Sequence, residues 1–348
     1  MPACSRNFCE EAVDIRGLKL LAAEKGYEEV VKGFKAEEGA KVKAAIIGGG
    51  TTGIAAAHYL ARAGIDTTIF EKRSSLGGIV KHIIPDFRIP EESIEKDIKL
   101  MELLGIKIKL NSEETSIEKL KKQGYKYVLI AVGAWKEGCL DIPGGEVIKV
   151  ISFLEGLKDK SSTIDLGRNV AIIGGGNTAV DAARAAKRLK SVEKVYMVYR
   201  RTKEYMPAEF EELQHALKEG IELKELLSPK EIKEGQLICE VMKLGEADES
   251  GRRAPIPTGE IISLKADSVI SAIGEKIDSG IYVKNNIAVD KNSKPLVDFN
   301  TLETNIENVF VAGDGLRGPA TVVQGMADAK RFAEAVFKKE KLISHPPY

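Results

Sequence analysis

The sequence has few cysteines, no excess of either charge and no long apolar run. Its four cysteines are too few for a disulfide scaffold in a chain of this size, which favours a reducing compartment. Lysine plus arginine equals aspartate plus glutamate, 52 each, so no net field attracts nucleic acid or an acidic membrane. No apolar stretch approaches the length of a membrane span, and the first residues do not resemble a signal peptide. These absences predict a cytoplasmic protein that binds neither nucleic acid nor membrane.

A glycine motif organises the first part of the chain. After an apolar run of strand length, glycines follow at the G-x-G-x-x-G spacing. Gly48 permits the tight turn out of the strand, Gly50 lets the backbone approach a pyrophosphate, and Gly53 lets the next helix pack closely on the strand. The N-terminus of that helix would point free N–H groups at the phosphates. In this context the motif predicts a dinucleotide site rather than a glycine-rich turn without a ligand.

The residues after this helix extend the prediction. A second strand over 66–70 delivers Glu71, whose carboxylate would accept hydrogen bonds from a ribose diol. The pair Gly77 and Gly78 follows, which is typical of flavoproteins that bind two dinucleotides and bring the chain close to FAD. The apolar stretch 79–90 has prolines at 85 and 90, so we expect an irregular loop that forms a wall against an isoalloxazine ring. His82 within it is more readily a polar neighbour than a catalytic base.

The opening pattern then repeats. Residues 171–176 match residues 45–50 one for one, so the chain should contain two dinucleotide-binding units. In the second unit the third glycine is Ala179, and the strand over 194–199 delivers Arg200 and Arg201 in place of an acid. A guanidinium pair binds a ribose phosphate, which a carboxylate would repel. The second site should therefore take NADP, unless the two arginines are only a solvated basic pair.

A short buried strand near the end of the chain carries the last acid of the pattern. Residues 308–311 lead to Gly313 and Asp314, and a helix should run from 324 to about 339. An aspartate at this place can bind the ribityl chain of FAD, and the helix N-terminus can face the flavin. The other interpretation is a turn or helix-capping acid. Stretches 221–226, 237–244 and 266–272 should be strands that complete the second unit.

With these motifs in place, the chain resembles the small (beta) subunit of NADPH-dependent glutamate synthase. Its relatives include the electron-input subunits of ferredoxin–NADP transhydrogenases and a putative selenate reductase subunit. The resemblance is carried by the repeated glycine blocks, by a helix expected over 12–26 and by residues 244–257. The last of these, with Leu-Gly-Glu-Ala-Asp and Pro-Ile-Pro, is the least generic match. The resemblance implies FAD, NADP, and hydride transfer from NADPH to FAD. Electrons would then leave through iron–sulfur clusters to a partner subunit.

The cysteines depart from this family. Relatives carry a cysteine-rich N-terminal domain with two cubane clusters, whereas only Cys4 and Cys9 precede the first helix here. Two thiolates cannot hold a cubane, which needs four ligands, and Cys139 and Cys239 are single and far apart in the sequence. The pair is either two reduced thiols or part of a cluster shared with another chain. We therefore predict no metal in the lone chain and a partner docked near an apolar exposed patch on the N-terminal helix.

The predicted architecture is α/β, with two Rossmann-like dinucleotide-binding domains and the NADP domain inserted into the FAD domain. Residues 1–41 form a helical N-terminal segment, a remnant of the iron–sulfur domain. Residues 42–146 and 286–348 form the FAD domain, and residues 147–285 form the NADP domain. The alternatives are a flavoprotein disulfide reductase, or one with another acceptor, and a non-catalytic scaffold subunit.

Hydride transfer between two flat rings needs geometry and no general acid or base, so no catalytic residue is predicted. The predicted site residues share one property, backbone or side-chain contact with a nucleotide cofactor. Those for FAD are Gly48, Gly50, Thr52, Gly53, Glu71, Lys72, Gly78, Ile79, Ala131, Gly133, Gly313, Asp314, Thr321 and Val322, and those for NADP are Gly174, Gly176, Asn177, Thr178, Ala179, Arg200 and Arg201.

Overall fold

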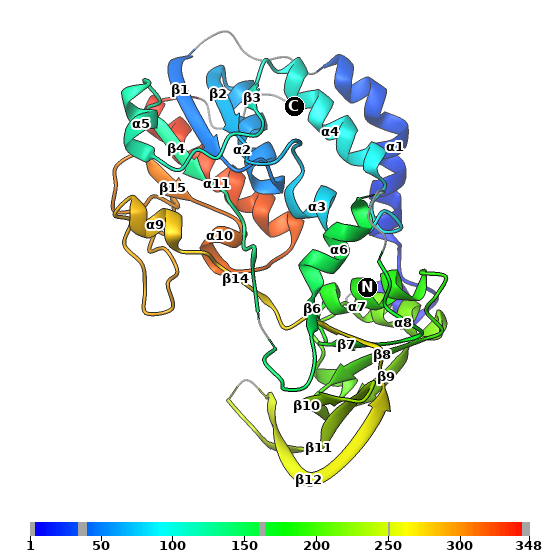
Figure 1. Ribbon diagram of the computed structural model, residues 1–348. Coiled ribbons are helices and arrows are strands. Elements are labelled where there is room, and N and C mark those ends of the chain that lie inside the picture. The colour runs from blue at the N-terminus through cyan, green and yellow to red at the C-terminus, as the bar shows by residue number, and fades with distance from the viewer. Residues whose placement is uncertain (1–3, 34–39, 139, 160–163, 250, 343–348) are drawn as a thin grey trace.

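A parallel five-stranded sheet forms the centre of the first unit in the computed structural model, which describes residues 4–33, 40–138, 140–159, 164–249 and 251–342 (Figure 1). The strand order is β15-β4-β1-β2-β3, and all neighbours are parallel. Helices cover the faces of this sheet, and β4 together with residues 44–47 of β1 forms continuous, buried apolar runs. The strands are β1 (Ala40–Ile47), β2 (Ile65–Phe70), β3 (Lys107–Lys109), β4 (Tyr127–Ile130) and β15 (Val309–Val311).

Small residues let the helices of the first unit approach this sheet. Helix α2 is rich in alanine on its buried side and contacts both β1 and α11. Phe310 on β15 and Phe332 on α11 pack edge to face, with ring centroids 4.9 Å apart, and join that helix to the sheet. The helices of this unit are α2 (Thr51–Arg62), α3 (Gly78–His82), α4 (Glu91–Leu103), α5 (Ile117–Lys122), α9 (Gly280–Lys284), α10 (Asp314–Arg317) and α11 (Val322–Glu340).

A second parallel sheet repeats the topology of the first. Its order is β6-β13-β7-β8-β9, so β7 has the central place that β1 has in the first sheet. A glycine loop follows the central strand in both. We call this sheet and its helices the second unit; its elements are β6 (Val147–Lys149), α6 (Val150–Lys158), β7 (Asn169–Ile173), α7 (Asn177–Lys187), β8 (Lys194–Tyr199), η2 (Lys203–Tyr205), α8 (Phe210–Lys218), β9 (Glu222–Glu225) and β13 (Ser268–Ser271).

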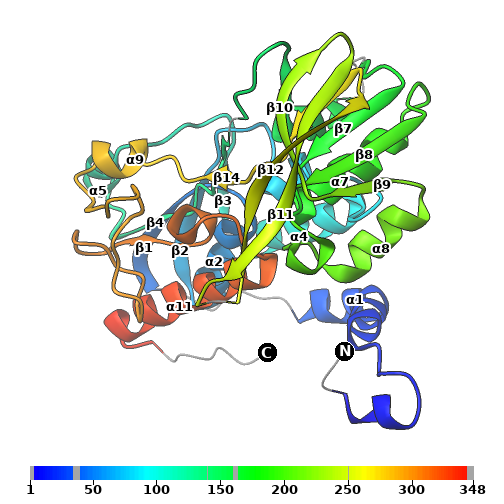
Figure 2. The same ribbon diagram turned by 90° about the horizontal axis from the view of Figure 1, so that it is seen from below.

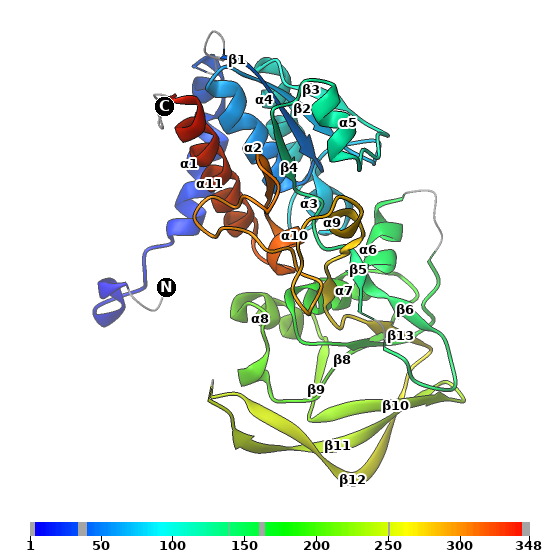
Figure 3. The same ribbon diagram turned by 90° about the vertical axis from the view of Figure 1, so that its left-hand side faces the viewer.

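An antiparallel sheet lies against the second unit, below it in Figures 1 and 3. It consists of β10 (Leu227–Lys233), β11 (Gln236–Ala247) and β12 (Arg253–Lys265). Leu237 and Cys239 on β11 are fully buried against the parallel sheet, and burial raises the pKa of the Cys239 thiol to about 12. The strand predicted over 237–244 exists as part of β11, and it packs on the second unit in an antiparallel sheet with β10 and β12.

The two units are joined by two crossings of the chain, which pair with each other. Strand β5 (Lys136–Glu137) leaves the first unit, β14 (Glu275–Lys276) returns to it, and the two form a short antiparallel ladder. Tyr282 on α9, just after the return, is fully buried in the core of the first unit. The domain boundaries given above stay a prediction, and the described packing places α9 with the first unit.

The N-terminal segment is longer and more exposed than a single capped helix. It comprises η1 (Ser5–Phe8) and α1 (Ile15–Lys32), so α1 continues past Gly26, where the sequence predicted its end. Glycine costs only about 1 kcal/mol relative to alanine inside a helix, which the other residues of α1 offset. Figure 2 shows this segment extending from the body of the protein. As expected, α1 exposes apolar side chains, among them Leu18 and Leu20.

Two further observations concern single segments. The stretch 79–90 is less irregular than predicted, because Gly78 to His82 forms the short helix α3 before the proline-bounded turn. The left-handed conformation of Gly77, with φ of 114°, starts this helix. In the described part of the chain, no helix is long and apolar enough to cross a membrane. Cys139 lies outside the described residues.

Candidate functional site

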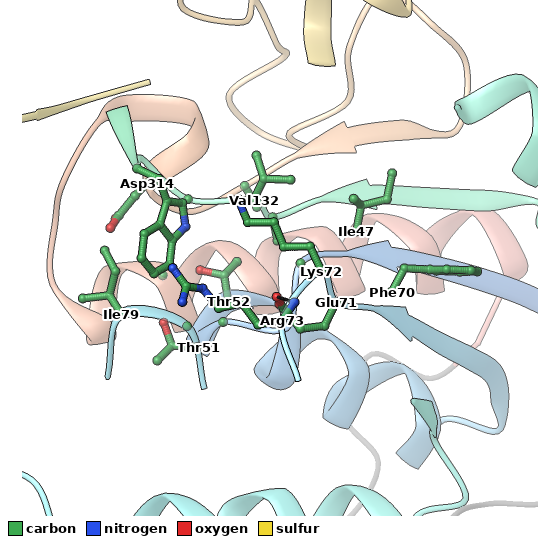
Figure 4. Close-up of a pocket in the computed structure, with 18 of the residues that line it drawn as sticks. Ile47, Thr51, Thr52, Phe70, Glu71, Lys72, Arg73, Ile79, Val132 and Asp314 are labelled. Atoms are coloured by element: carbon green, nitrogen blue, oxygen red, sulfur yellow. Dashed lines mark hydrogen bonds between the residues drawn. The ribbon is translucent and has the colours of Figure 1, made fainter. Parts of the chain in front are cut away.

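A cavity of about 550 Å³ opens at the carboxyl ends of the strands in the first sheet (Figure 4). This is the edge at which open α/β sheets bind ligands, and the volume suits a nucleotide-sized molecule. Twelve of the residues predicted to bind FAD line the cavity, namely Gly48, Gly50, Thr52, Glu71, Lys72, Gly78, Ile79, Ala131, Gly133, Asp314, Thr321 and Val322. The other two, Gly53 and Gly313, do not line it but support the turns behind the lining residues.

Glycine contacts keep the phosphate-facing part of this cavity open. A Cβ at Gly53 would lie 2.0 Å from the Gly48 carbonyl oxygen, so only glycine lets α2 start this close to the strand. Gly78 has a φ of 53°, and a Cβ there would lie 2.8 Å from the Gly50 Cα atom. The glycine loop and the Gly77-Gly78 pair therefore touch through bare backbone. This leaves a cradle at the N-terminus of α2 that fits a pyrophosphate.

Glu71 is buried at the end of β2, where the sequence predicted a ribose ligand (Figure 4). Its Oε2 accepts a hydrogen bond from the Gly49 N–H at 2.7 Å, and its Oε1 accepts one from the Arg73 N–H at 2.8 Å. The carboxylate thus holds the glycine loop in place. Each oxygen has a further lone pair for a ribose hydroxyl, so the two roles are compatible.

Arg73 and Trp135 also line the cavity, and no sequence motif indicated either residue. The Arg73 guanidinium carbon lies 4.5 Å from the centroid of the Trp135 ring, and Arg73 forms an ion pair with Glu155 on α6 of the second unit. Its Nε atom is buried and has no hydrogen-bond partner among the described residues. An unpaired donor at a nucleotide-sized cavity fits an anionic or acceptor-rich ligand such as FAD.

Asp314 begins α10 at the rim of the cavity, and α11 fixes its position. The buried carboxylate of Asp328 on α11 accepts a hydrogen bond from the Gly313 N–H at 2.9 Å and pairs with Arg317. Helix α11 starts at the cavity with a capping box, in which Thr321 and Gln324 bond reciprocally. The sequence predicted Asp314 and this helix. It did not indicate Asp328, which lies about two turns after Thr321 and Val322, the cavity residues at the start of the helix.

Burial raises the pKa of Asp314 to about 6, although the Ala320 N–H and the charge of Arg317 lower it. Because this pKa is higher than the ordinary value of 3.8, folding takes up a proton here. The contribution of this group to the free energy of unfolding is therefore present below about pH 4 and is lost as the pH rises through about 6.

We expect the substitution Asp314→Asn to remove this pH dependence. Relative to the parent, the variant should gain about 1–2 kcal/mol between pH 4 and pH 7, a figure reduced from the full pKa shift because the group is partly exposed. Urea unfolding of the flavin-free chain at both pH values measures it. An unchanged difference between the two proteins at pH 4 and pH 7 would contradict the assignment.

The second glycine loop lies at the start of α7, away from the cavity. The φ of Gly174 is 152°, and a Cβ there would lie 2.5 Å from the Ala272 carbonyl oxygen. At Gly176 a Cβ would meet only Pro207, at 4.0 Å, which leaves the backbone open to a phosphate. Ala179 replaces the third glycine and is fully buried. Thr178 is half-buried in the first turn.

The side chains around this loop divide into bound and free groups. Asn177 accepts a hydrogen bond from the Glu209 N–H at 2.9 Å and so holds the start of α8. Arg201 is buried, and its Nε donates to the Arg253 carbonyl oxygen on β12 at 2.8 Å. Arg200 is exposed, and no hydrogen bond or ion pair engages its guanidinium within the described part of the chain. The two adjacent arginines therefore have different environments, which the sequence alone did not indicate.

Among the described residues, the acidic side chains that line the cavity are Glu71, Glu113, Glu114, Asp278 and Asp314, and the lysines that line it are Lys72 and Lys284. His82 lies outside the lining, 3.4 Å from the Ser75 carbonyl oxygen, and burial lowers its pKa. Cys4, Cys9 and Cys239 are free thiols and are not part of the lining. No cluster of three or more histidine, cysteine or acidic residues in the described ranges has the geometry of a metal site.

Known proteins resemble this chain over nearly all of its length. It is 42% identical to "Putative oxidoreductase YgfK" of Escherichia coli K12, over 98% of this chain and 34% of that protein. It is 28% identical to "Glutamate synthase [NADPH] small chain" of Azospirillum brasilense, over 87% of this chain and 67% of that one. The chain thus spans about a third of the length of the YgfK relatives. The predicted resemblance to the glutamate synthase small-subunit group is confirmed.

Solved structures resemble it in fold. One of them, "Mycobacterium tuberculosis FprA in complex with NADPH", has a TM-score of 0.72 and 20% identity, over 86% of this chain and 84% of that one. This likeness confirms the predicted fold class. The family model for pyridine nucleotide-disulphide oxidoreductases matches residues 42–329, which include both glycine loops and the cavity. The chain therefore belongs to the pyridine nucleotide-disulphide oxidoreductase family, an enzyme family with FAD- and NADP-binding architecture.

Proposed function

We propose that the chain is an NADPH-dependent flavin oxidoreductase in which the first unit holds FAD and the second unit holds NADPH. The observation that carries this proposal is that the two glycine loops have side chains of opposite charge beside them. Buried Glu71 lies beside the first loop, and exposed Arg200 follows the strand next to the second. A carboxylate suits a ribose diol, and a guanidinium suits a ribose phosphate.

In this function NADPH loses two electrons and one proton as a hydride, becoming NADP+, and FAD accepts them. The protein's part is to bind and orient both nucleotides and to exclude water. Gly50, Gly78 and the N-terminus of α2 would hold the FAD pyrophosphate, with Arg73 and Trp135 near it. Thr321 and Val322 would place the N-terminus of α11 at the flavin, where negative charge develops on reduction.

A direct experiment tests the proposal. The purified chain should be yellow, and anaerobic NADPH should bleach its flavin absorbance near 450 nm. NADH at the same concentration should bleach it much more slowly. A colourless chain that takes up no FAD, or a yellow one that NADPH does not bleach, would favour the non-catalytic scaffold alternative. The disulfide-reductase alternative has less support, since no described cysteine lines the cavity.

We propose further that electrons leave to an iron–sulfur partner. The glutamate synthase relative is named as a small chain, which supports a multi-subunit setting. Helix α1 supports it as well, because in the described residues it buries no side chain and exposes Leu18, Leu20 and Leu21. Free cysteine thiols and soluble nucleotide cofactors support a cytoplasmic location.

The isolated chain should contain flavin and essentially no iron or acid-labile sulfide, because Cys4 and Cys9 provide two thiolates at most. NADPH should reduce the flavin quickly, whereas reoxidation should be slow until oxygen or an artificial dye is added. Metal analysis after anaerobic purification and stopped-flow absorbance measure the two parts. Near-stoichiometric iron in the lone chain would contradict the flavin-only prediction and favour a cluster shared between chains.

A further inference from the structure

The connection between the two units is narrow. Strands β5 and β14 pair over two residues each, and the Gly138 N–H adds one hydrogen bond of 3.0 Å to the Gly274 carbonyl oxygen. Two crossings at one place leave rotation about that place as the easiest relative motion of the units. Contacts far from this crossing therefore decide how the second unit faces the cavity.

One such contact is built from the turn that follows α3. Arg88 of the first unit donates from Nη1 to both carboxylate oxygens of Asp181 on α7, at 2.9 and 3.1 Å. Its Nη2 lies 3.4 Å from Glu212 on α8. The side chain of Asp181 is only 7% exposed, so its charge depends on this arginine from the other unit. We call the contacts of residues 85–88 with α7 and α8 the interunit latch.

Neighbouring side chains extend the latch. The guanidinium carbons of Arg184 on α7 and of Arg188, which caps the end of that helix, lie 4.8 and 4.0 Å from the Phe87 ring centroid. Glu212 on α8 and Glu219, which caps the end of that helix, pair with the same arginines and keep them oriented. The Phe87 ring of the first unit thus contacts two guanidinium groups of the second unit, beside the buried Arg88–Asp181 ion pair. This combination fixes both position and direction, which a single surface ion pair would not.

The latch lies close to both cofactor sites along the chain. Ile84 lines the FAD cavity, four residues before Arg88. Asp181 follows Asn177, where α7 begins at the second glycine loop, by about one turn. Ile79, another lining residue, packs against the core of the second unit. The wall of the cavity at this end therefore packs against the core of the second unit, of which α7 is a part.

We propose that Arg88 is a positioning residue for hydride transfer: its ion pair with Asp181 holds the second glycine loop beside the flavin end of the cavity. This inference rests on the proposed function. Arg88 does not line the cavity, so it acts through α7. The Arg73–Glu155 ion pair and the packing of Ile79 also join the units. Loosening the latch would leave each nucleotide site intact but would give the units more freedom to rotate about β5 and β14, and the two rings would then meet less often.

The substitution Arg88→Ala tests this in the full-length flavin-loaded chain. We expect FAD content and the NADP+ dissociation constant to stay within about threefold of the parent. The flavin reduction rate at saturating NADPH should fall at least tenfold, and the long-wavelength charge-transfer absorbance of the mixture should weaken. Arg88→Lys, which keeps one donor, should restore part of the rate. Arg168→Ala removes an exposed ion pair with Glu193 inside the second unit and should behave as the parent.

A second measurement does not depend on turnover. Trp135 is the only tryptophan of the chain and packs against the core of the second unit from the cavity side. In flavin-free protein, acrylamide should quench its fluorescence more strongly in Arg88→Ala than in the parent or in Arg168→Ala. Should Arg88→Ala fail to fold, Asp181→Asn removes the same charge pair at nearly constant volume and should give the same two effects.

The possible outcomes distinguish a failure of the proposed function from a failure of the positioning role of Arg88. A parent chain whose flavin NADPH does not reduce would contradict the proposed function and not the latch. A parent that is reduced normally, with variants whose saturating rate and Trp135 quenching match it, would overturn the positioning role. A loss confined to NADP+ affinity would also overturn it, because Arg88 would then belong to the nucleotide site. A faster reduction in Arg88→Ala would show that the latch holds a resting arrangement, contrary to the proposal.

Discussion

Replacing Arg200 with alanine is expected to raise the Michaelis constant for NADPH and leave that for NADH nearly unchanged. Hydrogen bonds to charged groups contribute about 1.5–3 kcal/mol each, so the loss should be roughly 10- to 100-fold. The exposed guanidinium of Arg200 has no partner in the described part of the chain, so its removal disturbs nothing but the ligand. Steady-state reduction of an artificial dye with each nucleotide measures the effect.

Arg201→Ala provides the matched comparison. This arginine is buried and donates to the Arg253 carbonyl oxygen, so its loss removes a charged hydrogen bond and the packing of a buried side chain against the β11–β12 hairpin. We expect a lower free energy of unfolding, by about 1–3 kcal/mol, which Arg200→Ala should not show. If Arg200→Ala affects both nucleotides equally, Arg200 does not read the ribose phosphate.

The second large effect is expected at Glu71. In Glu71→Gln, one of the two backbone N–H groups now bonded by the carboxylate faces an amide NH₂ group instead of an oxygen. A buried donor without an acceptor costs about 1–3 kcal/mol, and the ribose hydroxyls lose a charged acceptor. We therefore expect the purified variant to contain much less FAD and to require a high FAD concentration for activity.

A control variant shows whether the effect of Glu71→Gln comes from its position at the cavity or from the loss of any one carboxylate charge. Glu102→Gln makes the same chemical change on the exposed side of α4 and should retain full flavin. Flavin absorbance per polypeptide after gel filtration compares the two variants, and urea unfolding of the flavin-free forms shows how much of the effect is structural. Full flavin in Glu71→Gln at low FAD concentration would show that this carboxylate is not a ligand.

The fold was predictable where the sequence carries local signals. The two glycine blocks and the apolar strands before them predicted both parallel sheets, because a tight turn and a close helix–strand contact each require glycine. The antiparallel sheet was missed because an apolar stretch such as 237–244 has the same composition whether its partner is parallel or antiparallel. Pairing is decided by distant residues, and no local pattern records it.

The candidate site was also predictable where the sequence carries local signals, and was not predictable where distant residues decide. Gly50, Glu71 and Asp314 occupy positions set by strand ends, so their spacing predicted that they would meet at one cavity. Arg73, Trp135 and Asp328 could not be assigned, because their roles come from neighbours far along the chain. The different environments of Arg200 and Arg201 have the same origin, since the carbonyl group that engages Arg201 lies 52 residues away.

The position of β15 in the first sheet has a consequence for the order in which the protein matures during synthesis. The second unit is assembled from one continuous stretch, 147–271, and can fold as soon as that stretch has left the ribosome. The first sheet lacks its edge strand until residues 309–311 appear, and α11 closes the cavity later still. The nascent chain should therefore acquire its capacity for NADP(H) before its capacity for flavin. FAD binding would then be the last step of maturation, and flavin availability would act on a chain whose second unit has already folded.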